Sequence, residues 1–474
     1  MHRHLEMIRH LFTRFIYKLY KPLSTILYRQ AFNKMTITSL NIIPRKNHPV
    51  SRNLISPSAL KVMHRLHSKG YEAFLVGGGV RDILLGHQPK DFDIATNAHP
   101  EQVHALFKNS RLIGRRFKLV HILFGREMIE VATFRGQASE QNEKQSEHGM
   151  LLRDNVYGTI EEDAIRRDFT VNSLYYSPKD FCIYDYLNSL NDIQDKQLRL
   201  IGDPETRYRE DPVRMLRALR FASKLGFEIS PETRDPIYEY APLLGNIAAA
   251  RLFDEVLKLF LSGHASSIFK DLLKYGLFGP LFPQVNQTLN THHRASFYIK
   301  LIEAGLHNTD QRIRAEKPVT PAFLYATLLW PEVDRIWQQL KAEGVPEFPA
   351  LQQAGQQALQ AQVKHISIPK RFSLMMKEIW EYQIRLQKTQ GNRPLQLIEQ
   401  PRFRAAYDFL LLREQAGENV NGLGKWWTNF QIKHPAPVHH KSRKPRYKSN
   451  NAENREKDDK KHSRPPRRRK YKQD

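Results

Sequence analysis

The sequence predicts an α+β protein in which a compact α/β head precedes a long body built from helices. Between residues 71 and 134, short apolar segments rich in β-branched and aromatic residues alternate with helix signals. From residue 210 onward, leucine- and arginine-rich segments with helical periodicity replace them. A chain of 474 residues is too long for one compact domain, so we expect several folded units.

Composition narrows the class of protein. Hydrophobic residues make up 41% of the chain and charged residues 26%, which is typical of a soluble protein with real cores. Cys182 is the only cysteine, which excludes a disulfide framework and favours a cytoplasmic protein. No apolar run reaches the length that an ordinary transmembrane helix needs.

The net charge of +25 is concentrated at the two ends of the chain. Residues 1–50 hold nine Lys or Arg against the single acid Glu6, and residues 437–474 hold fifteen against five acids. A basic tail such as RPPRRRKYK at 464–472 favours binding to a nucleic acid, because neutralised phosphates release counterions. The alternative is a tail that only keeps the protein soluble.

Residues 1–34 show apolar side chains at helical spacing with basic residues between them. Three interpretations stay open: a helix that makes peripheral membrane contact, an organellar transit peptide, or a gene start placed too early, with the true start at Met35. We assign this arm no catalytic role.

The head is expected to begin near residue 55, where Ser56 and Pro57 can start a helix that stops at Gly70. A strand over 71–76, a turn of three glycines and a short helix ending at Gly86 follow. Further strands are expected over 91–96, 117–124 and 128–134, with a helix from Pro100 and a polar, mobile loop over 137–148.

The body is predicted from helical periodicity at 212–226, 250–262, 266–276 and 320–341. The last ordered apolar segment is 425–430, and the Pro-, Lys- and Arg-rich residues beyond it are expected to be disordered.

Asp91 and Asp93 are the first candidates for chemistry. On a strand, side chains two residues apart face the same way, so both carboxylates would project from one surface. Such a pair can hold two Mg²⁺ ions, one activating a hydroxyl and one stabilising a leaving group. An isolated pair of this kind is more often a strand-edge acidic pair, so its surroundings decide.

Two neighbouring features support a site at this pair. Gly77, Gly78 and Gly79 lie between a strand and a helix, where the backbone can approach a phosphate and Arg81 adds charge. Glu130 interrupts an apolar strand, an expensive choice unless the carboxylate is paired or binds metal. Neither a Walker loop nor a complete dinucleotide fingerprint is present.

Three longer stretches resemble the class II nucleotidyltransferases, which comprise CCA-adding tRNA nucleotidyltransferases and bacterial poly(A) polymerases. They are LVGGGVRDILLGHQPKDFDIATNA (75–98), RRDFTVNSLYY (166–176) and REDPVRMLRALRFASKLGF (209–227). The resemblance covers roughly residues 50–275. It implies a nucleotidyltransferase head over 51–176 and all-α neck, body and leg domains, the neck at 177–275 and the body and leg at 276–430. Residues 1–50 and 431–474 are then the N-terminal extension and the basic RNA-binding tail.

The resemblance also implies roles for single residues. Asp91 and Asp93 would be the metal-binding catalytic pair and Glu130 the third carboxylate. Residues that would bind the triphosphate or the ribose are the following: Gly78, Gly79, Arg81, Arg167, Asp168 and Asn172. For the last three, a salt-bridge cluster at a helix start is the alternative interpretation.

Asp211 and Arg214 have two interpretations. Asp211 followed by Pro212 is typical of a helix start. Asp211 and Arg214 would also share one helix face, where a carboxylate and a guanidinium can read the base edge of ATP, as the resemblance implies.

The stretch LIGRRFKLVHI (112–122) resembles the bacterial poly(A) polymerases within this family, and so favours AMP addition from ATP to single-stranded RNA 3′ ends with a two-ion Mg²⁺ mechanism. A CCA-adding enzyme is the first alternative, and a non-catalytic RNA-binding protein is the second. RNA and ATP are the expected partners, and RNA-decay machinery is a further candidate.

Overall fold

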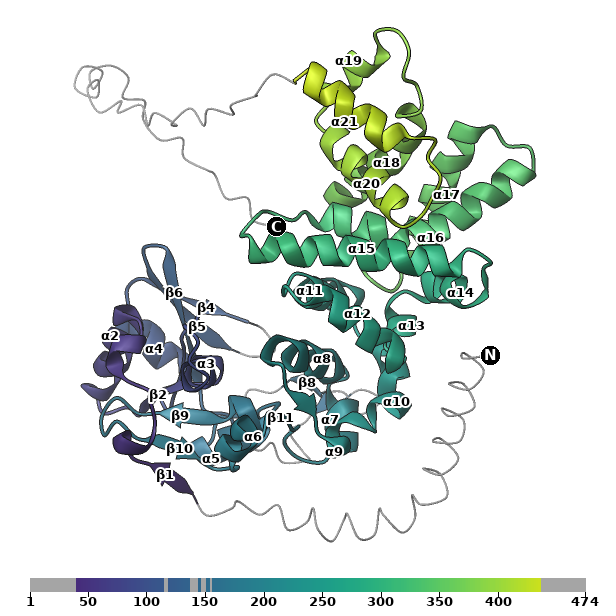
Figure 1. Ribbon diagram of the computed structural model, residues 1–474. Helices are drawn as coiled ribbons and strands as arrows, with labels where there is room; N and C mark the ends of the chain where they lie inside the picture. The colour runs from purple at the N-terminus through teal and green to yellow at the C-terminus, as the bar shows by residue number, and fades with distance from the viewer. Residues whose placement is uncertain (1–39, 115–117, 137–143, 146–150, 154–155, 436–474) are drawn as a thin grey trace, which may run out of the picture.

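The computed structural model describes residues 40–114, 118–136, 144–145, 151–153 and 156–435. These form a mixed α/β head followed by a helical region, as the sequence predicts (Figure 1). The amphipathic segment expected within residues 1–34 and the disordered tail expected after residue 435 lie outside the described residues. Among the described residues, no helix combines the length and the apolar character required for a membrane span.

An eight-stranded sheet, with strand order β1-β10-β9-β2-β3-β6-β5-β4, forms the centre of the head. Its strands, in chain order, are β1 (Asn41–Ile43), β2 (Ala73–Val76), β3 (Asp93–Thr96), β4 (Ser110–Ile113), β5 (Leu119–Phe124), β6 (Glu127–Thr133), β9 (Leu174–Tyr176) and β10 (Ile183–Asp185). Only β3 and β6 pair in parallel within this sheet.

The sequence located the central strands to within two residues but missed the outer ones. β1 lies inside the segment 1–50 that we assigned to an N-terminal extension, and β4, β9 and β10 were not expected. These four strands have three or four residues each, too short for a periodicity signal. Part of the loop expected over 137–148 lies outside the described residues, while Lys144–Gln145 (β7) pairs with Leu151–Arg153 (β8).

Helices of the head cover the two faces of the sheet unequally. On one face, α2 (Pro57–His67) and α4 (Pro100–Leu106) bury the side chains of alternate strand residues, including Leu75, Ile94 and Val131. On the other face, α5 (Ile160–Arg166) covers Phe74, Ala95 and Tyr175, all on β2, β3 and β9. The sheet therefore has a separate apolar core on each face, and β2 and β3 contribute side chains to both.

The residues expected to start or stop helices do so in α2 and α3. Ser56 caps α2, since its side chain accepts a hydrogen bond from the Ala59 amide at 3.0 Å. α3 (Gly78–Leu84) follows β2 directly after Gly77, and Gly86 lies just beyond its end with a φ of +74°.

The described residues that follow the head are mainly helical and pack as a second mass beside it (Figure 1). Its helices are α6 (Ser189–Gln194), α7 (Pro204–Glu210), α8 (Val213–Leu225), α9 (Pro231–Arg234), α10 (Ile237–Tyr240), α11 (Ala249–Phe260), α12 (Ala265–Lys274), α13 (Phe278–Leu281), α14 (Pro283–Thr291), α15 (Ala295–Arg314), α16 (Pro321–Ala342), α17 (Glu347–Gln362), α18 (Lys370–Arg385), α19 (Arg393–Ile398), α20 (Phe403–Gln415) and α21 (Leu423–Lys433). A short parallel pair, β11 (Gln197–Leu198) and β12 (Glu228–Ile229), lies beside α8.

Two contacts between head and neck position α7 and α8. Arg207 of α7 donates hydrogen bonds to the carbonyl oxygens of Arg166 at 2.8 Å and Arg167 at 2.6 Å, at the C-terminal end of α5. Phe221 of α8 meets Phe169 of the head edge to face, with ring centroids 5.7 Å apart. The first turns of α8 are thereby held against the head.

Candidate active site

Three carboxylates gather where β3 and β6 lie side by side. Asp93 is the first residue of β3, and Asp91 lies two residues earlier, just before the strand rather than on it as expected. Glu130 is the direct register partner of Asp93 on β6. Parallel register partners point to the same face, so Asp93 and Glu130 are neighbours on the face that α5 partly covers.

The carboxyl group of Asp93 is electrostatically strained. Its side chain is open to solvent, yet the surrounding protein desolvates the carboxyl, and together with repulsion from Glu130 and Asp91 this raises its pKa to about 6. Arg167 offsets part of the effect. A bound cation would remove the repulsion between these anions.

Asp91 and Asp93 therefore suit a divalent cation such as Mg²⁺. Among the described residues, no three His, Cys, Asp or Glu side chains are grouped tightly enough to bind a metal ion on their own. Magnesium usually takes one or two protein carboxylates and completes its shell with substrate phosphates and water. Two carboxylates beside a glycine turn that suits a phosphate match that requirement.

Gly77 is the glycine on which the phosphate turn depends. Its φ of +65° and ψ of −128° are accessible to glycine and strained for other residues. An added Cβ would lie 3.4 Å from Nη1 of Arg167 and 3.7 Å from the Asn172 carbonyl oxygen. Gly78 and Gly79, which the sequence singled out, form the first turn of α3 in ordinary helical conformation, and at Gly79 a Cβ would lie 3.7 Å from the Asp91 carbonyl oxygen.

Arg81 is buried and already paired. Its Nε donates to Asp82 at 2.9 Å, and Nη1 donates to the side-chain oxygen of Asn172. Asn172 in turn donates from Nδ2 to Asp168 at 3.1 Å. The structure thus places Arg81, Asn172 and Asp168 together, but as one hydrogen-bonded chain and not as three free groups.

That chain ends on the neck. Oδ2 of Asp168 accepts hydrogen bonds from Nε of Arg217 at 2.7 Å and from its Nη2 at 2.5 Å, a charge-assisted pair between head and α8. Burial alone would raise the pKa of Asp168, but Arg217 and Asn172 hold it well below its usual range. The salt-bridge cluster that was the alternative interpretation for Arg167, Asp168 and Asn172 is therefore present in the structure, and it does not exclude a role of these residues in ligand binding.

Arg167 lies beside the glycine turn at Gly77 and has partners of its own. Its Nη2 donates to Asp163 at 2.9 Å and its Nε to the Tyr175 hydroxyl at 2.8 Å. Its position near Gly77 and its charge interaction with Asp93 place it between the glycine turn and the carboxylates.

The side chains of Asp211 and Arg214 form no salt bridge with each other, although their backbones share a hydrogen bond of 3.0 Å. α8 begins at Val213, one residue later than expected, and Asp211 ends α7. The Asp211 carboxylate accepts a hydrogen bond from Arg251 of α11 at 2.8 Å. Arg214 lies 3.8 Å from Glu210, and its buried Nε has no hydrogen-bond partner among the described residues. A buried donor without a partner is costly, and a ligand at this point would satisfy it.

Two arginines of α8, Arg217 and Arg220, were not predicted as site residues from the sequence, although Arg214 on the same helix was. Arg214, Arg217 and Arg220 recur every three residues and lie on one side of the helix. Arg220 has no carboxylate within salt-bridge distance in the described part of the chain, and burial, reinforced by Arg217, lowers its pKa. The i, i+3, i+6 spacing in RMLRALR was the available signal.

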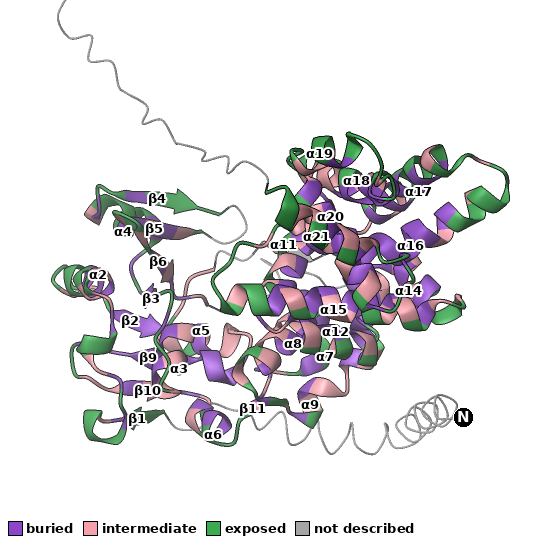
Figure 2. Ribbon diagram, turned by 45° about the horizontal axis from the view of Figure 1, so that its top comes forward, coloured by how far each residue is buried: buried purple, intermediate pink, exposed green. Residues whose placement is uncertain are grey.

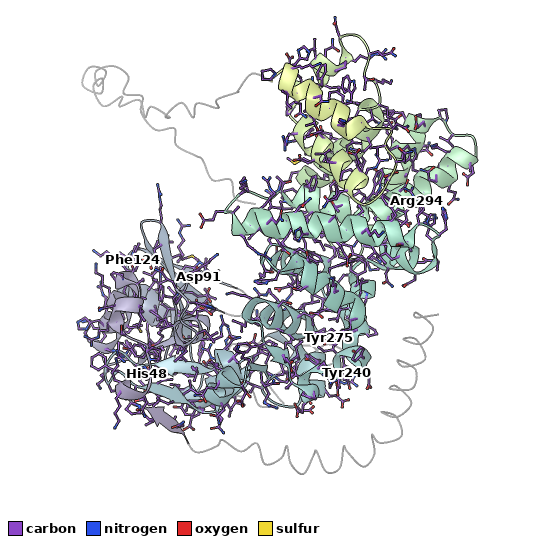
Figure 3. All side chains as sticks on the ribbon, viewed as in Figure 1. His48, Asp91, Phe124, Tyr240, Tyr275 and Arg294 are labelled. Atoms are coloured by element: carbon purple, nitrogen blue, oxygen red, sulfur yellow. The ribbon has the colours of Figure 1, made fainter. Side chains whose placement is uncertain are left out.

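Together these groups suit a nucleoside triphosphate. Figure 3 shows Asp91 on the side of the head that faces the helical mass. The glycine turn offers backbone close to Arg167, the α8 arginines supply positive charge, and the carboxylates suit cations. By contrast, a cavity of about 950 Å³ lined by Lys61, His64 and Tyr184 lies at the far end of β2 and includes none of these residues.

The chain is similar to known nucleotidyltransferases over most of its length. Residues 73–199 match the family described as poly A polymerase head domain, residues 226–289 a probable RNA- and SrmB-binding site of polymerase A, and residues 343–471 an arginine-rich C-terminus of polymerase A. Poly(A) polymerase I of Escherichia coli is 50% identical over 84% of this chain and 87% of its own length.

Enzymes named for CCA addition are more distant. A CCA-adding enzyme of Lactobacillus helveticus is 36% identical over 45% of this chain and 52% of its own. The structure of the Thermotoga maritima CCA-adding enzyme with tRNA has the same fold, with a TM-score of 0.53 and 18% identity over 84% of this chain and 87% of that one.

The raised pKa of Asp93 predicts that Asp93→Asn stabilises the protein at high pH. The folded pKa of about 6 lies above the unfolded value of about 3.8, so the ionised form destabilises the fold and the loss appears as pH rises through 6. Without divalent cations, the variant should melt at a higher temperature than the parent at pH 8 and at the same temperature near pH 4. Calorimetry with and without Mg²⁺ measures this, and Mg²⁺ should raise the melting temperature of the parent alone. An equal response of both proteins to Mg²⁺ would contradict the assignment.

The pair between Asp168 and Arg217 predicts a coupled loss of stability. Asp168→Asn leaves the Arg217 guanidinium half-buried without its anion and should lower the free energy of unfolding by about 2–3 kcal/mol. Arg217→Met should cost a similar amount, and the double variant little more than either. A denaturant-based double-mutant cycle measures the coupling, with Arg209→Met, an exposed arginine on α7, as the control. Additive losses would show that the two side chains act independently.

Proposed function

This chain belongs to the poly(A) polymerase I family, and from that premise we propose that it extends RNA 3′ ends with AMP from ATP, without a template. The observation that supports this most directly is the juxtaposition of Asp93 and Glu130, in register on β3 and β6, beside the glycine turn and Arg167. Similarity to Escherichia coli poly(A) polymerase I over most of both chains supports the choice of ATP.

The reaction joins the RNA 3′ oxygen to the α-phosphorus of ATP and breaks the bond to the β-phosphate, so pyrophosphate leaves and the hydroxyl proton passes to solvent. Mg²⁺ bound at Asp91 and Asp93 would activate the hydroxyl and stabilise the leaving oxygens. Gly77, with Gly78 and Gly79 behind it, brings backbone to the phosphates, and Arg167 lies between that turn and the carboxylates. The electrostatic contribution of these fixed groups is the main source of rate enhancement.

Recognition of adenine is assigned to the first turn of α8. Arg214 has a buried Nε in need of an acceptor, which N1 of adenine would supply. Asp211 can accept from the N6 amino group while Arg251 holds its carboxylate in place. Arg217 and Arg220 continue the same row and suit the triphosphate, with Arg81, Asp168 and Asn172 fixing the position of Arg217.

We assign RNA contact to the helical region and to the tail. The match of residues 226–289 to a probable RNA- and SrmB-binding site and of 343–471 to an arginine-rich C-terminus supports this assignment. A cytoplasmic site of action and contact with RNA-decay machinery complete the proposal, and peripheral membrane contact is one of the three open interpretations of residues 1–34.

The activity is tested with Mg²⁺ and each nucleoside triphosphate in turn, on a generic single-stranded RNA and on a tRNA that lacks its 3′ terminus. A long ladder with ATP on both RNAs is the expected product. Addition of a few nucleotides that needs CTP and is confined to tRNA would identify a CCA-adding enzyme instead. RNA binding without any product would indicate a non-catalytic binder.

The catalytic pair predicts a separation of binding from chemistry. Asp93→Ala removes one of the two proposed magnesium ligands, so extension should fall below detection, while the dissociation constant for RNA stays within about twofold. Gel electrophoresis of labelled RNA and a filter-binding titration measure the two quantities. Asp195→Ala, on an exposed acid at the end of α6, is the matched control. Measurable extension by Asp93→Ala would refute the assignment.

The basic tail predicts a change in salt dependence. A chain ending at residue 436 loses fifteen Lys or Arg and five acids. Its RNA affinity should fall, and the slope of log K against log salt should become less negative by about 0.7 for each phosphate that the shortened protein no longer neutralises. Turnover at saturating RNA should be retained, because the site lies within the described head and neck. An unchanged slope would show that the tail does not bind RNA.

A further inference from the structure

No helix in the described part of the chain covers one half of a sheet face in the head. α5 covers β9, β2 and β3, but on β6, β5 and β4 the same face carries exposed apolar side chains. Ile113, Leu123 and Met128 are 41%, 36% and 45% exposed, and Leu119 is half-buried among them. We call these four residues the open sheet face. Figure 2 shows β4 as a largely exposed strand at the edge of the head, beside the more buried β5.

The strand register shows that the open sheet face is continuous with the catalytic carboxylates. Asp93 pairs with Glu130, Glu130 with His121, and His121 with Arg111, so these four side chains form one row across β3, β6, β5 and β4. The apolar residues flank this row. Met128 and Leu123 pair with each other on one side of His121, and Leu119 and Ile113 pair on the other.

The direction of the reaction places the RNA on this face. The groups that suit the triphosphate, Gly77, Arg167 and the α8 arginines, lie on the side of Asp93 where α5 and the neck pack. In phosphoryl transfer the attacking and leaving oxygens lie roughly in line on opposite sides of phosphorus. The RNA 3′ hydroxyl must therefore approach Asp93 from the side of Glu130 and His121.

We propose that the open sheet face binds the unpaired 3′-terminal nucleotides of the RNA, whose bases lie on Ile113, Leu119, Leu123 and Met128. This inference rests on the proposed nucleotide addition. Bases present flat, weakly hydrated surfaces that bind apolar side chains without sequence preference, which suits a growing end of any sequence. Arg111, which has no carboxylate partner among the described residues, lies at the outer end of the row and matches a backbone phosphate.

The same assignment gives the stretch 112–122 a physical role. Leu119 and His121 alternate with the buried Val120 and Ile122, so the strand presents one side to the core and the other to RNA. At this edge, β4 presents Ile113 to the open sheet face and Leu112 to the opposite face.

The decisive experiment compares polar substitutions on the two faces. The double variant Leu123→Gln, Met128→Gln should raise KM for an oligo(A) primer about fivefold or more, while KM for ATP and kcat stay within about twofold. Leu112→Gln is the matched control, because Leu112 is 44% exposed on the neighbouring strand but points to the opposite face. Both proteins should keep the parent's melting temperature, since the replaced side chains are exposed. An unchanged primer KM in the double variant, or an equal rise for Leu112→Gln, would overturn the inference.

A second measurement does not depend on catalysis. RNA with 4-thiouridine at its last or penultimate position should cross-link, in the Asp93→Ala protein, to peptides that contain residues 111–113 or 119–130. Cross-links confined to the helical region would overturn the inference even if AMP addition were established. Cross-links to the open sheet face in a protein without AMP addition would leave the inference intact while refuting the proposed activity.

Discussion

The ion pair in which two nitrogens of Arg217 donate to one oxygen of Asp168 is the interaction on which the geometry of the candidate site depends. It fixes α8 against the head at the point where the glycine turn, through Arg81 and Asn172, reaches the same carboxylate. The first turn of α8, with Arg214, can then face the strands that carry Asp93 and Glu130, although more than eighty residues of sequence separate it from either carboxylate. Replacing this contact with apolar side chains would keep the neck folded but lose its defined position.

Much of this could be predicted from the sequence, because the relevant signals are local. The cap at Ser56, the glycine turn and the charged residue inside the β6 strand each follow from nearest neighbours. The family resemblance drew attention to Asp91, Asp93 and Arg214 for the same reason, since short motifs fix short pieces of backbone.

The hydrogen-bond partners of the site residues could not be predicted from local signals in the sequence. Arg81 and Asp168 were expected to meet a ligand, yet in the fold they complete a chain of hydrogen bonds to Asn172 and Arg217. The Asp211 carboxylate bonds to Arg251, forty residues away, while its contact with Arg214 is a backbone hydrogen bond. The open sheet face depends on strand order and on where α5 ends its cover, both of which are long-range properties. Only the assembled sheet shows that Glu130 and His121 are neighbours.

The terminal position of β4 has a consequence for the behaviour of the protein in solution. β4 is the last strand of the sheet, so one side of its backbone has no ladder partner among the described strands, and Leu112 and Ile113 are exposed on its two faces. An edge of this kind is a template for pairing with another chain, and proteins counter it by shortness and charge. β4 has four residues and carries Arg111. The colloidal stability of the protein therefore rests partly on that single charge, and an apolar replacement at Arg111 would favour self-association through the edge.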